Sequence, residues 1–254
     1  MQWNVLAVSL IALAASTTFA SAQSTTTEIA PTGKLRGSVI GIKVLGGVGE
    51  PIGRFVAEKL GVPFELVMYR SPQAYEQGFS KSDWDIALGP RVLAPADKAD
   101  VTPDVWLIDL LYLAAAGRTF AKADDVDRAG VKVGTIQDSP SDRFLTHALK
   151  SAQLVRLPLS QNFPNDAVDL LRTGKADVFG ADAGLIDAIS GGYPEARRVP
   201  GAFNTVHAAV ALPKGRSPAA QARLADLLRE AKRSGIVQKA IEQAGLTSGV
   251  RVAP

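Results

Sequence analysis

Three glycines, Gly47, Gly49 and Gly53, follow an apolar run and precede a helical pattern. Such a turn binds dinucleotides when the spacing is G-x-G-x-x-G, because the turn is tight and backbone N–H groups face the pyrophosphate. Here the third glycine is one position late, and the next apolar run ends at Arg70 rather than at an acidic residue for a ribose hydroxyl. We therefore favour a structural role, in which the glycines leave free N–H groups of the following helix pointing into a cleft.

Other reactive groups are scarce. The sequence has no cysteine, which excludes thiol nucleophiles, CxxC redox motifs, disulfides and cysteine zinc sites. Of its two histidines, His207 falls in an apolar strand pattern and is interpreted as a hydrogen-bonded core or cleft residue, and His147 as a surface residue. Asp83 and Asp85 are interpreted as loop caps. Because no G-x-S-x-G, P-loop or H-E-x-x-H motif occurs, we predict no catalytic machinery, no cofactor and no metal.

The composition is that of a folded globular protein, with 46% hydrophobic and 21% charged residues among 254. The net charge is +3, and the basic excess is concentrated after Lys214. The charges there lie at helical intervals, and no aromatic residue stands between them to stack on bases. We interpret this region as a solvated helix face and expect no nucleic-acid partner.

The first 22 residues have the pattern of a signal peptide. Residues 1–27 carry no Lys, Arg, Asp or Glu, and Val5–Ala15 form an apolar run too short to span a bilayer. Ala20 and Ala22 match the A-x-A cleavage pattern, although the first residues lack the usual Lys or Arg. Since no cysteine is present to carry a lipid anchor, we expect a freely diffusing protein of the periplasm.

Downstream, short β-rich runs alternate with helical patterns in two successive series, which is typical of an α/β fold with mainly parallel strands. The expected strands are 39–45, 64–69, 86–88, 106–116, 131–136, 154–157, 178–180 and 206–212. The expected helices are 52–60, 71–79, 139–149, 167–174, 182–189, 217–231 and 236–244. Serine-proline pairs favour helix starts, and either Ser139 or Ser141 caps the third of these helices.

Six short motifs occur in a characteristic order. They are Lys81-Ser-Asp-Trp84-Asp85-Ile-Ala, Thr102-Pro103 leading to Tyr112-Leu113, Asp124-Asp-Val-Asp127-Arg-Ala-Gly130-Val-Lys-Val133-Gly, Ser139-x-x-Asp142-x-x-Leu145, Leu171-x-x-Gly174-x-Ala176-Asp177-x-x-x-x-Asp182, and Ala211-Leu-Pro213-Lys-Gly215. Together they resemble the extracellular solute-binding proteins of family 3, the polar amino-acid receptors of ABC importers. The resemblance covers nearly all of the chain after the signal peptide.

This resemblance implies a two-lobed α/β fold of the type II periplasmic binding proteins, with two parallel-rich sheets, flanking helices and two hinge crossings. The crossings are expected near 110–117 and 205–210. Lobe 1 would comprise 23–113 and 207–254, and lobe 2 would comprise 114–206. A ligand would be held between the lobes, which close on it by a hinge motion.

The resemblance also implies site residues. The receptors clamp the ligand α-carboxylate with an arginine shortly before a Thr/Ser-x-Pro segment; this sequence lacks it, and Arg91 is the best replacement, with Lys98 behind it. The Gly-Ser/Thr loop of the receptors corresponds to Asp138-Ser139. Asp182 matches the aspartate that binds a ligand ammonium, and it is equally well placed to cap the following helix.

The expected protein is therefore a monomeric periplasmic receptor, not an enzyme. It would capture a small polar or anionic solute, amino-acid-like or carboxylate, and deliver it to the permease of an ABC importer. Arg143, Glu50 and Tyr69 are further candidate ligand-binding residues. Two alternatives remain: an exported enzyme on the same fold, such as a cyclohexadienyl dehydratase-like lyase, and a periplasmic sensor or accessory ligand-binding protein.

Overall fold

The computed structural model describes residues 24–41, 47–246 and 248–254. The predicted signal peptide, residues 1–22, lies outside the described residues, and so do residues 42–45 of the predicted strand 39–45. Among the described residues, no helix is both long enough and apolar enough to cross a membrane.

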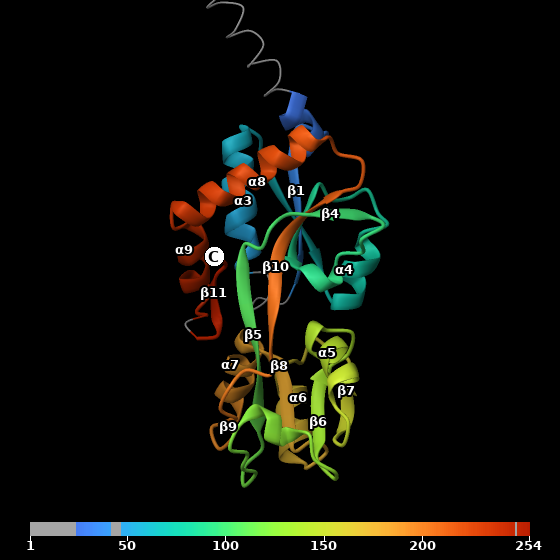
Figure 1. The fold of residues 1–254 in the computed structure, drawn as a ribbon, viewed down its shortest axis with the longest axis vertical. Coiled ribbons are helices and arrows are strands. Elements are labelled where there is room, and N and C mark those ends of the chain that lie inside the picture. Colours follow the sequence, from blue (N-terminus) through green and yellow to red (C-terminus); the bar gives the residue numbers. More distant parts are fainter. Residues whose placement is uncertain (1–23, 42–46, 247) are drawn as a thin grey trace, which may run out of the picture.

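The strands form one mixed sheet with the order β2-β1-β3-β10-β5-β8-β6-β7; β4 is added to β10, and β9 and β11 to β5 (Figure 1). Their bounds are β1 Leu35–Ile40, β2 Phe64–Tyr69, β3 Ile86–Pro90, β4 Ala99–Val101, β5 Trp106–Ala114, β6 Lys132–Ile136, β7 Gln153–Leu157, β8 Val178–Asp182, β9 Arg197–Arg198, β10 Asn204–Pro213 and β11 Val250–Val252. The pairs β1–β2, β1–β3, β6–β7 and β6–β8 are parallel, and β3–β10, β10–β5 and β5–β8 are antiparallel. The predicted mixed α/β fold is therefore confirmed.

The prediction of two separate sheets is wrong. The strands form two parallel groups, β2-β1-β3 and β8-β6-β7, and strand β5 connects them because it pairs with β10 and with β8. Residues 106–110 of β5 pair with β10, and residues 110–114 pair with β8. A nine-residue strand is long enough to serve one partner with each half. Strands β10 and β5 thus join the parallel group β2-β1-β3 to the parallel group β8-β6-β7 in one continuous sheet.

Three helices begin with a serine-proline pair, as predicted for those that start after Ser71 and Ser217. The labelled helices are α3 Gly49–Leu60, α4 Pro72–Gly78, α5 Pro140–Ala148, α6 Asn165–Arg172, α7 Ala183–Gly192, α8 Pro218–Arg233 and α9 Ile236–Gln243, with short 3-10 turns η1 Arg91–Leu93 and η2 Ala123–Val126; residues 24–29 are also helical. Ser71, Ser139 and Ser217 each accept a hydrogen bond from the backbone N–H three residues on, which satisfies a donor that the helix leaves unpaired. Ser139, rather than Ser141, is therefore the cap of α5.

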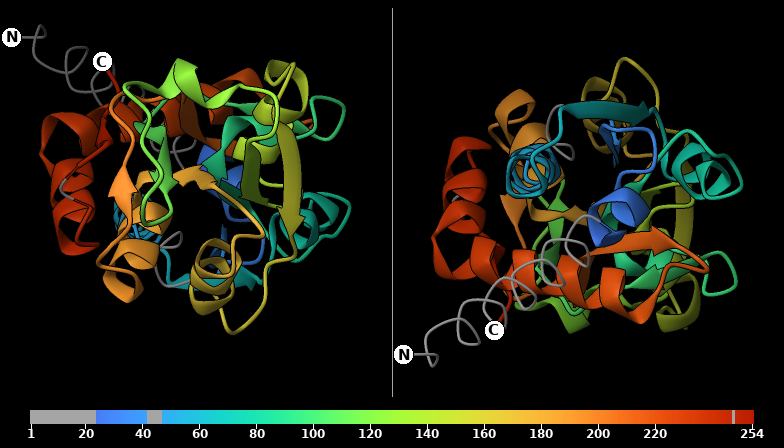
Figure 2. Two further views of the ribbon diagram at one scale, coloured as in Figure 1. Left: turned by 90° about the horizontal axis from the view of Figure 1, so that it is seen from below. Right: turned by 90° about the horizontal axis from the view of Figure 1, so that it is seen from above.

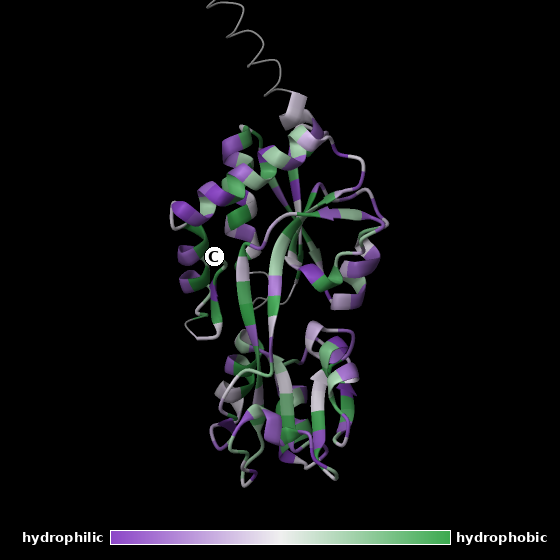
Figure 3. Ribbon diagram, in the orientation of Figure 1, coloured by the Kyte–Doolittle hydropathy of each residue, from purple (hydrophilic) through white to green (hydrophobic). Residues whose placement is uncertain are grey.

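The helices gather around the two ends of the sheet. Helices α3, α4, α8 and α9 surround the part that contains β1 and β3, whereas α5, α6 and α7 flank β6 and β8 (Figure 1). Seen along the long axis, α9 and α4 lie on opposite sides of the molecule (Figure 2). Helices α8 and α9 carry both hydrophobic and hydrophilic bands, as expected of helices with one face in the core (Figure 3).

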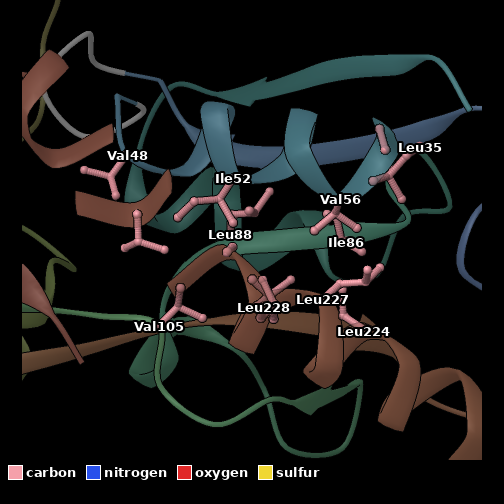
Figure 4. Packing of buried hydrophobic residues seen from close by; sticks show 14 of the residues in the cluster. Leu35, Val48, Ile52, Val56, Ile86, Leu88, Val105, Leu224, Leu227 and Leu228 are labelled. Carbon is pink, nitrogen blue, oxygen red and sulfur yellow. The ribbon is translucent and has the colours of Figure 1, made fainter. Parts of the chain in front are cut away.

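The largest hydrophobic core lies between α3, β3 and α8 (Figure 4). Ile52 and Val56 of α3 are fully buried, and Ile86 of β3 lies between them and the α8 residue Leu224. Burying a side chain of this size contributes about 1.5–3 kcal/mol. This packing fixes β3, whose last residues reach the site described below.

Two glycines of the Gly47-x-Gly49-x-x-x-Gly53 segment, Gly49 and Gly53, are closely packed. A Cβ on Gly53 of α3 would lie 2.6 Å from Cε2 of Phe64, and a Cβ on Gly37 of β1 would lie equally close to the same atom. The Phe64 ring is thus held between strand and helix, where a larger residue would clash. Neither Gly49 nor Gly53 is among the described lining residues of the cavity described below.

Strand β1 begins at Leu35, four residues before the predicted start, and pairs with β2 from Leu35–Phe64 onward. The first residues of β1 were not predicted, because the charged residue Arg36 interrupts the apolar run on which the prediction was based. The Arg36 guanidinium donates to Asp85, from Nη2 to Oδ1 at 2.7 Å and from Nε to Oδ2 at 3.0 Å, and its backbone N–H donates to Oδ2 at 2.8 Å. Asp85, 0% exposed, therefore anchors β1 beside β3 and is not a loop cap.

Candidate functional site

A cavity lies where the carboxyl ends of β1 and β3 approach the carboxyl ends of β6 and β8. The first turns of α4, α5 and α7 border the same space. In α/β proteins with parallel strands, ligands bind at this place, because strand-end loops and helix N-termini converge there. The cavity has a volume of about 50 Å³, and the empty space around it, its opening included, is about 670 Å³.

The described lining of this cavity is mostly apolar. Thirteen of its sixteen residues are hydrophobic residues, prolines or a glycine, and the three others are Ser139, Ser141 and Asp182. The thirteen are Ile40, Pro72, Leu88, Gly89, Pro90, Trp106, Ile108, Leu110, Ile136, Pro140, Leu159, Leu185 and Val206. The site thus combines a large apolar wall with a few polar groups, which is the usual composition of a small-molecule pocket.

Asp182, the last residue of β8, is the one ionisable side chain in that described lining. Its Oδ1 accepts a hydrogen bond from the Leu185 N–H at 3.0 Å and so caps α7. Burial raises the pKa of Asp182 to about 6, while backbone hydrogen bonds partly offset this effect. The capping role left open by the sequence is therefore real, and the same carboxylate also borders the cavity.

Ser139 and Ser141 belong to a chain of buried hydroxyl groups. Ser139 Oγ lies 2.8 Å from Ser141 Oγ, which lies 3.0 Å from Thr135 Oγ1. Thr135 Oγ1 in turn donates to the Gly180 carbonyl at 2.9 Å. The chain links the start of α5 to β6 and β8, so these hydroxyl groups are fixed in place before any ligand arrives.

A second, larger cavity of about 680 Å³ lies beside the first, between η1, α5 and the start of β10. It contains Arg91 and Arg143, two of the residues predicted to bind the ligand, and both histidines of the chain. The structure therefore separates the predicted site residues: Ser139 and Asp182 border the apolar cavity, and Arg91 and Arg143 border this one.

Arg91 is held by Asp104. Its Nη2 donates to Asp104 Oδ1 at 2.7 Å and to the Thr102 carbonyl at 2.6 Å. His207 Nδ1 lies 2.6 Å from the other carboxylate oxygen, Asp104 Oδ2, which confirms His207 as a hydrogen-bonded cleft residue. Burial would raise the pKa of Asp104, but the hydrogen bonds from His207 and Arg91 hold it below its usual value. Arg91 is thus already neutralised by a carboxylate of its own chain.

Arg143, on α5, forms an ion pair with Glu76, on α4. The two side chains are 37% exposed each, and the pair joins the two ends of the sheet across the gap between these helices. Among the described residues, Arg143 Nε is also one of the buried polar atoms without a hydrogen-bond partner.

The other predicted ligand-binding residues lie outside both cavities. Glu50 accepts hydrogen bonds from Arg54 one turn later on α3, at 2.7 and 2.9 Å. Tyr69 is a core residue whose hydroxyl donates to Asp83 Oδ1 at 2.7 Å. Asp138 adopts a left-handed backbone with φ 61°, and its N–H donates to Asp142 Oδ2.

Sequence reasoning missed the apolar wall, in particular Trp106, Ile108 and Leu110 of β5. The signal was present, since these three alternate along one face of a nine-residue strand. Nothing in the pattern, however, separates a core face from a cavity face. Metal chemistry has no candidate here, because the described residues contain no group of three or more His, Cys, Asp or Glu able to hold an ion.

No protein-family model matches the chain, and neither does any curated protein. Solved structures do match. A solute receptor for L-cysteine from Neisseria gonorrhoeae aligns with a TM-score of 0.69 at 16% identity, over 90% of this chain and 99% of that one. An amino acid ABC transporter substrate-binding protein of Streptococcus pneumoniae, bound to L-arginine, aligns with 0.65 at 18%, over 85% and 96%. An ancestral amino acid-binding protein, a precursor of cyclohexadienyl dehydratase, aligns with 0.68 at 18%, over 86% and 98%.

At identities of 16–18%, this likeness shows the fold alone. The chain has the mixed α/β fold of the type II periplasmic binding proteins over nearly its whole described length. The resemblance to amino-acid receptors of ABC importers is thereby confirmed at the level of the fold. The fold does not identify the molecule that the chain binds, which has to be inferred from the residues of its own cavity.

Proposed function

We propose that this protein is a solute-binding receptor, which captures a small molecule in the cavity bordered by Ser139 and Asp182 and delivers it to the permease of an ABC importer. The observation that supports this function best is the position of the cavity. It lies where the strand ends of both parallel groups meet, and it is lined from both. Binding and closure would suffice for this function, and no chemical step is needed.

The proposal includes two lobes that close on the ligand, and the hydrophobic cores support this division. Two clusters are built from β1–β4, α3, α4, α8 and α9 together with Trp106 of β5 and residues 208–212 of β10, and two others from residues 111–203. Tyr112, assigned to lobe 1 from the sequence, stacks on Phe203 with ring centroids 4.2 Å apart and pairs with Gly180 of β8. We therefore place the first crossing at Leu110 rather than after Leu113.

The Glu76–Arg143 ion pair would join these lobes and favour the closed arrangement. Because both side chains are partly exposed, the pair contributes at most about 1 kcal/mol, or about a fivefold shift in population. We expect Glu76→Gln or Arg143→Gln to increase the radius of gyration of the ligand-free protein in small-angle X-ray scattering. The charge-swapped variant Glu76→Arg with Arg143→Glu should restore the native value.

Glu50→Gln is the matched control for that experiment, since Glu50 pairs with Arg54 within one helix. It should leave the scattering profile unchanged. Single variants that scatter like the native protein would show that this pair does not hold the lobes together.

A thermal-shift screen tests the receptor function itself. A ligand at 100 times its Kd should stabilise the protein by about 2.7 kcal/mol, which corresponds to a melting temperature higher by about 5–10 °C for a chain of this size. The library should contain amino acids, carboxylates, phosphonates and amines, and the ligand should be recovered unchanged. If no compound raises the melting temperature, the receptor function is refuted.

A second function, an exported lyase on the same fold, is favoured by one observation. The carboxyl group of Asp182, with a pKa of about 6, is suited to act as a general acid near neutral pH. One of the similar structures is moreover an amino acid-binding protein that is a precursor of cyclohexadienyl dehydratase. Incubation with prephenate separates the two functions: turnover supports the lyase, whereas an unchanged substrate supports the receptor.

A further inference from the structure

The segment 248–252, which we call the β11 strap, runs along β5 to the boundary between the two lobes. Strand β11 pairs with β5 from Val250–Ile108 to Val252–Trp106 and lies above α7 in Figure 1. Because β10 pairs with the same residues of β5, β11 must occupy the opposite edge, which β8 uses further along. The start of the strap in lobe 1 therefore meets the end of β8 and the start of α7 in lobe 2.

Gly249 of the strap lies against Ala183, the first residue of α7. A Cβ on Gly249 would stand 2.6 Å from the Ala183 Cβ, whereas two carbon atoms in contact are about 3.5–4.0 Å apart. The space between the lobes is therefore already filled at this point, and a residue without a side chain is needed for so close an approach.

This contact lies on the face of β5 opposite to the cavity. Side chains along a strand point alternately to its two faces. Every residue of β5 in the described lining has an even number, so Asp109 and Leu111 point away from the cavity. A Cβ on Gly249 would lie 3.6 Å from the Asp109 Cβ and 3.7 Å from Leu111 Cδ1. Seen from the cavity, Gly249 and Ala183 thus meet behind the strand.

The strap is fixed to lobe 1. The two valines of β11 pack against the largest core, which belongs to that lobe. Asp109 Oδ1 accepts hydrogen bonds from Arg251 Nη1 at 2.8 Å and from Thr205 Oγ1 at 2.9 Å, and these bonds tie the strap to both β5 and β10. The Asp109 N–H also donates to the Gly249 carbonyl at 2.7 Å. The strap should therefore move with lobe 1 when the lobes rotate.

We propose that the contact between Gly249 and Ala183 is a stop that limits how far the two lobes open. This inference rests on the proposed function, whose closure the stop would regulate. When lobes hinged at β5 separate on the cavity side, they approach each other behind the strand, where these two residues already touch. Close-packed atoms yield little, so opening ends at this contact. A smaller open population raises the apparent affinity for a ligand that binds the closed form.

Small-angle X-ray scattering of the ligand-free variant Glu76→Gln tests the stop, because the ion pair across the cavity side is then removed. Adding Ala183→Gly leaves space behind β5, so the radius of gyration should rise above that of Glu76→Gln alone. Adding Gly249→Ala fills that space, and the radius should fall below the same value. With both additions, one methyl group replaces the other, and the radius should return to that of Glu76→Gln.

Gly245→Ala is the control for backbone strain. Gly245 and Gly249 have φ values of 73° and 74°, so alanine is equally strained at both positions. Among the described residues beyond its chain neighbours, however, no atom lies within 4 Å of a Cβ on Gly245. Ala219→Gly, at an exposed position in the first turn of α8, is the control for the lost methyl group. Neither control should change the radius of gyration.

The outcomes separate the stop from the receptor function, because the scattering needs no ligand. The stop is refuted if Ala183→Gly scatters like Ala219→Gly, or if folded Gly249→Ala scatters like Gly245→Ala. If Gly249→Ala does not fold, the comparison of Ala183→Gly with Ala219→Gly decides alone. A thermal-shift screen without any hit refutes the receptor function and leaves the stop in place, whereas unchanged scattering does the reverse.

Discussion

Replacing Asp85 with alanine is expected to lower the free energy of unfolding by about 3–5 kcal/mol. Asp85 is fully buried, and Arg36, whose side chain is 17% exposed, donates to it from the guanidinium and from the backbone. Removing the carboxylate leaves a nearly buried cation without its partner. The Arg36 N–H also loses its acceptor, at the point where β1 begins to pair with β3.

Chemical denaturation at pH 7 measures this cost, and the melting temperature should fall by about 6–20 °C. Glu65→Gln is the control, because Glu65 of β2 pairs with Lys34, just before β1, and the two side chains are 47% and 45% exposed. It should cost less than about 1 kcal/mol. The double variant Arg36→Met with Asp85→Leu should recover most of the loss, since two apolar side chains leave no unpaired charge.

If Asp85→Ala were no more costly than Glu65→Gln, the pair would not anchor β1. Loss of the Arg36–Asp85 pair would also affect the site, because β3 contributes Leu88, Gly89 and Pro90 to the lining of the cavity. The Arg36–Asp85 pair is thus the structural support of one wall, although it lies outside the lining itself.

The local signals in the sequence were reliable where one residue type determines the backbone. Ser71-Pro72 and Ser217-Pro218 were interpreted as helix starts, and both are confirmed; for α5 the choice between Ser139 and Ser141 was left open, and Ser139 is the cap. The cap position of Asp182 was recognised for the same reason. Both the strand-helix alternation and the polar end of the cavity could therefore be predicted.

Contacts between distant segments could not be predicted. Arg91 was chosen as the anion-binding residue, but its partner Asp104 follows 13 residues later, and no local pattern indicates that the two side chains meet. The continuous sheet depends similarly on β5 being shared between β10 and β8. Whether Ile108 faces a core or a cavity depends on how two groups of strands are arranged, which periodicity does not encode.

Asp182→Asn is expected to stabilise the ligand-free protein at pH 7 by up to about 3 kcal/mol. The folded protein raises the pKa of Asp182 from 3.8 to about 6, and each unit corresponds to about 1.4 kcal/mol. Between about pH 4 and pH 6 the unfolded chain releases this proton while the folded protein retains it. Stability therefore falls as the pH rises through this window, and the full cost is present above it.

Asparagine has no charge to desolvate and keeps the oxygen that accepts the Leu185 N–H, so its gain should appear at pH 7 and vanish at pH 4. Urea denaturation at the two pH values measures the difference, and Asp187→Asn should show no such gain. If the variant were no more stable than the native protein at pH 7, burial of the ionised Asp182 carboxylate would carry no cost.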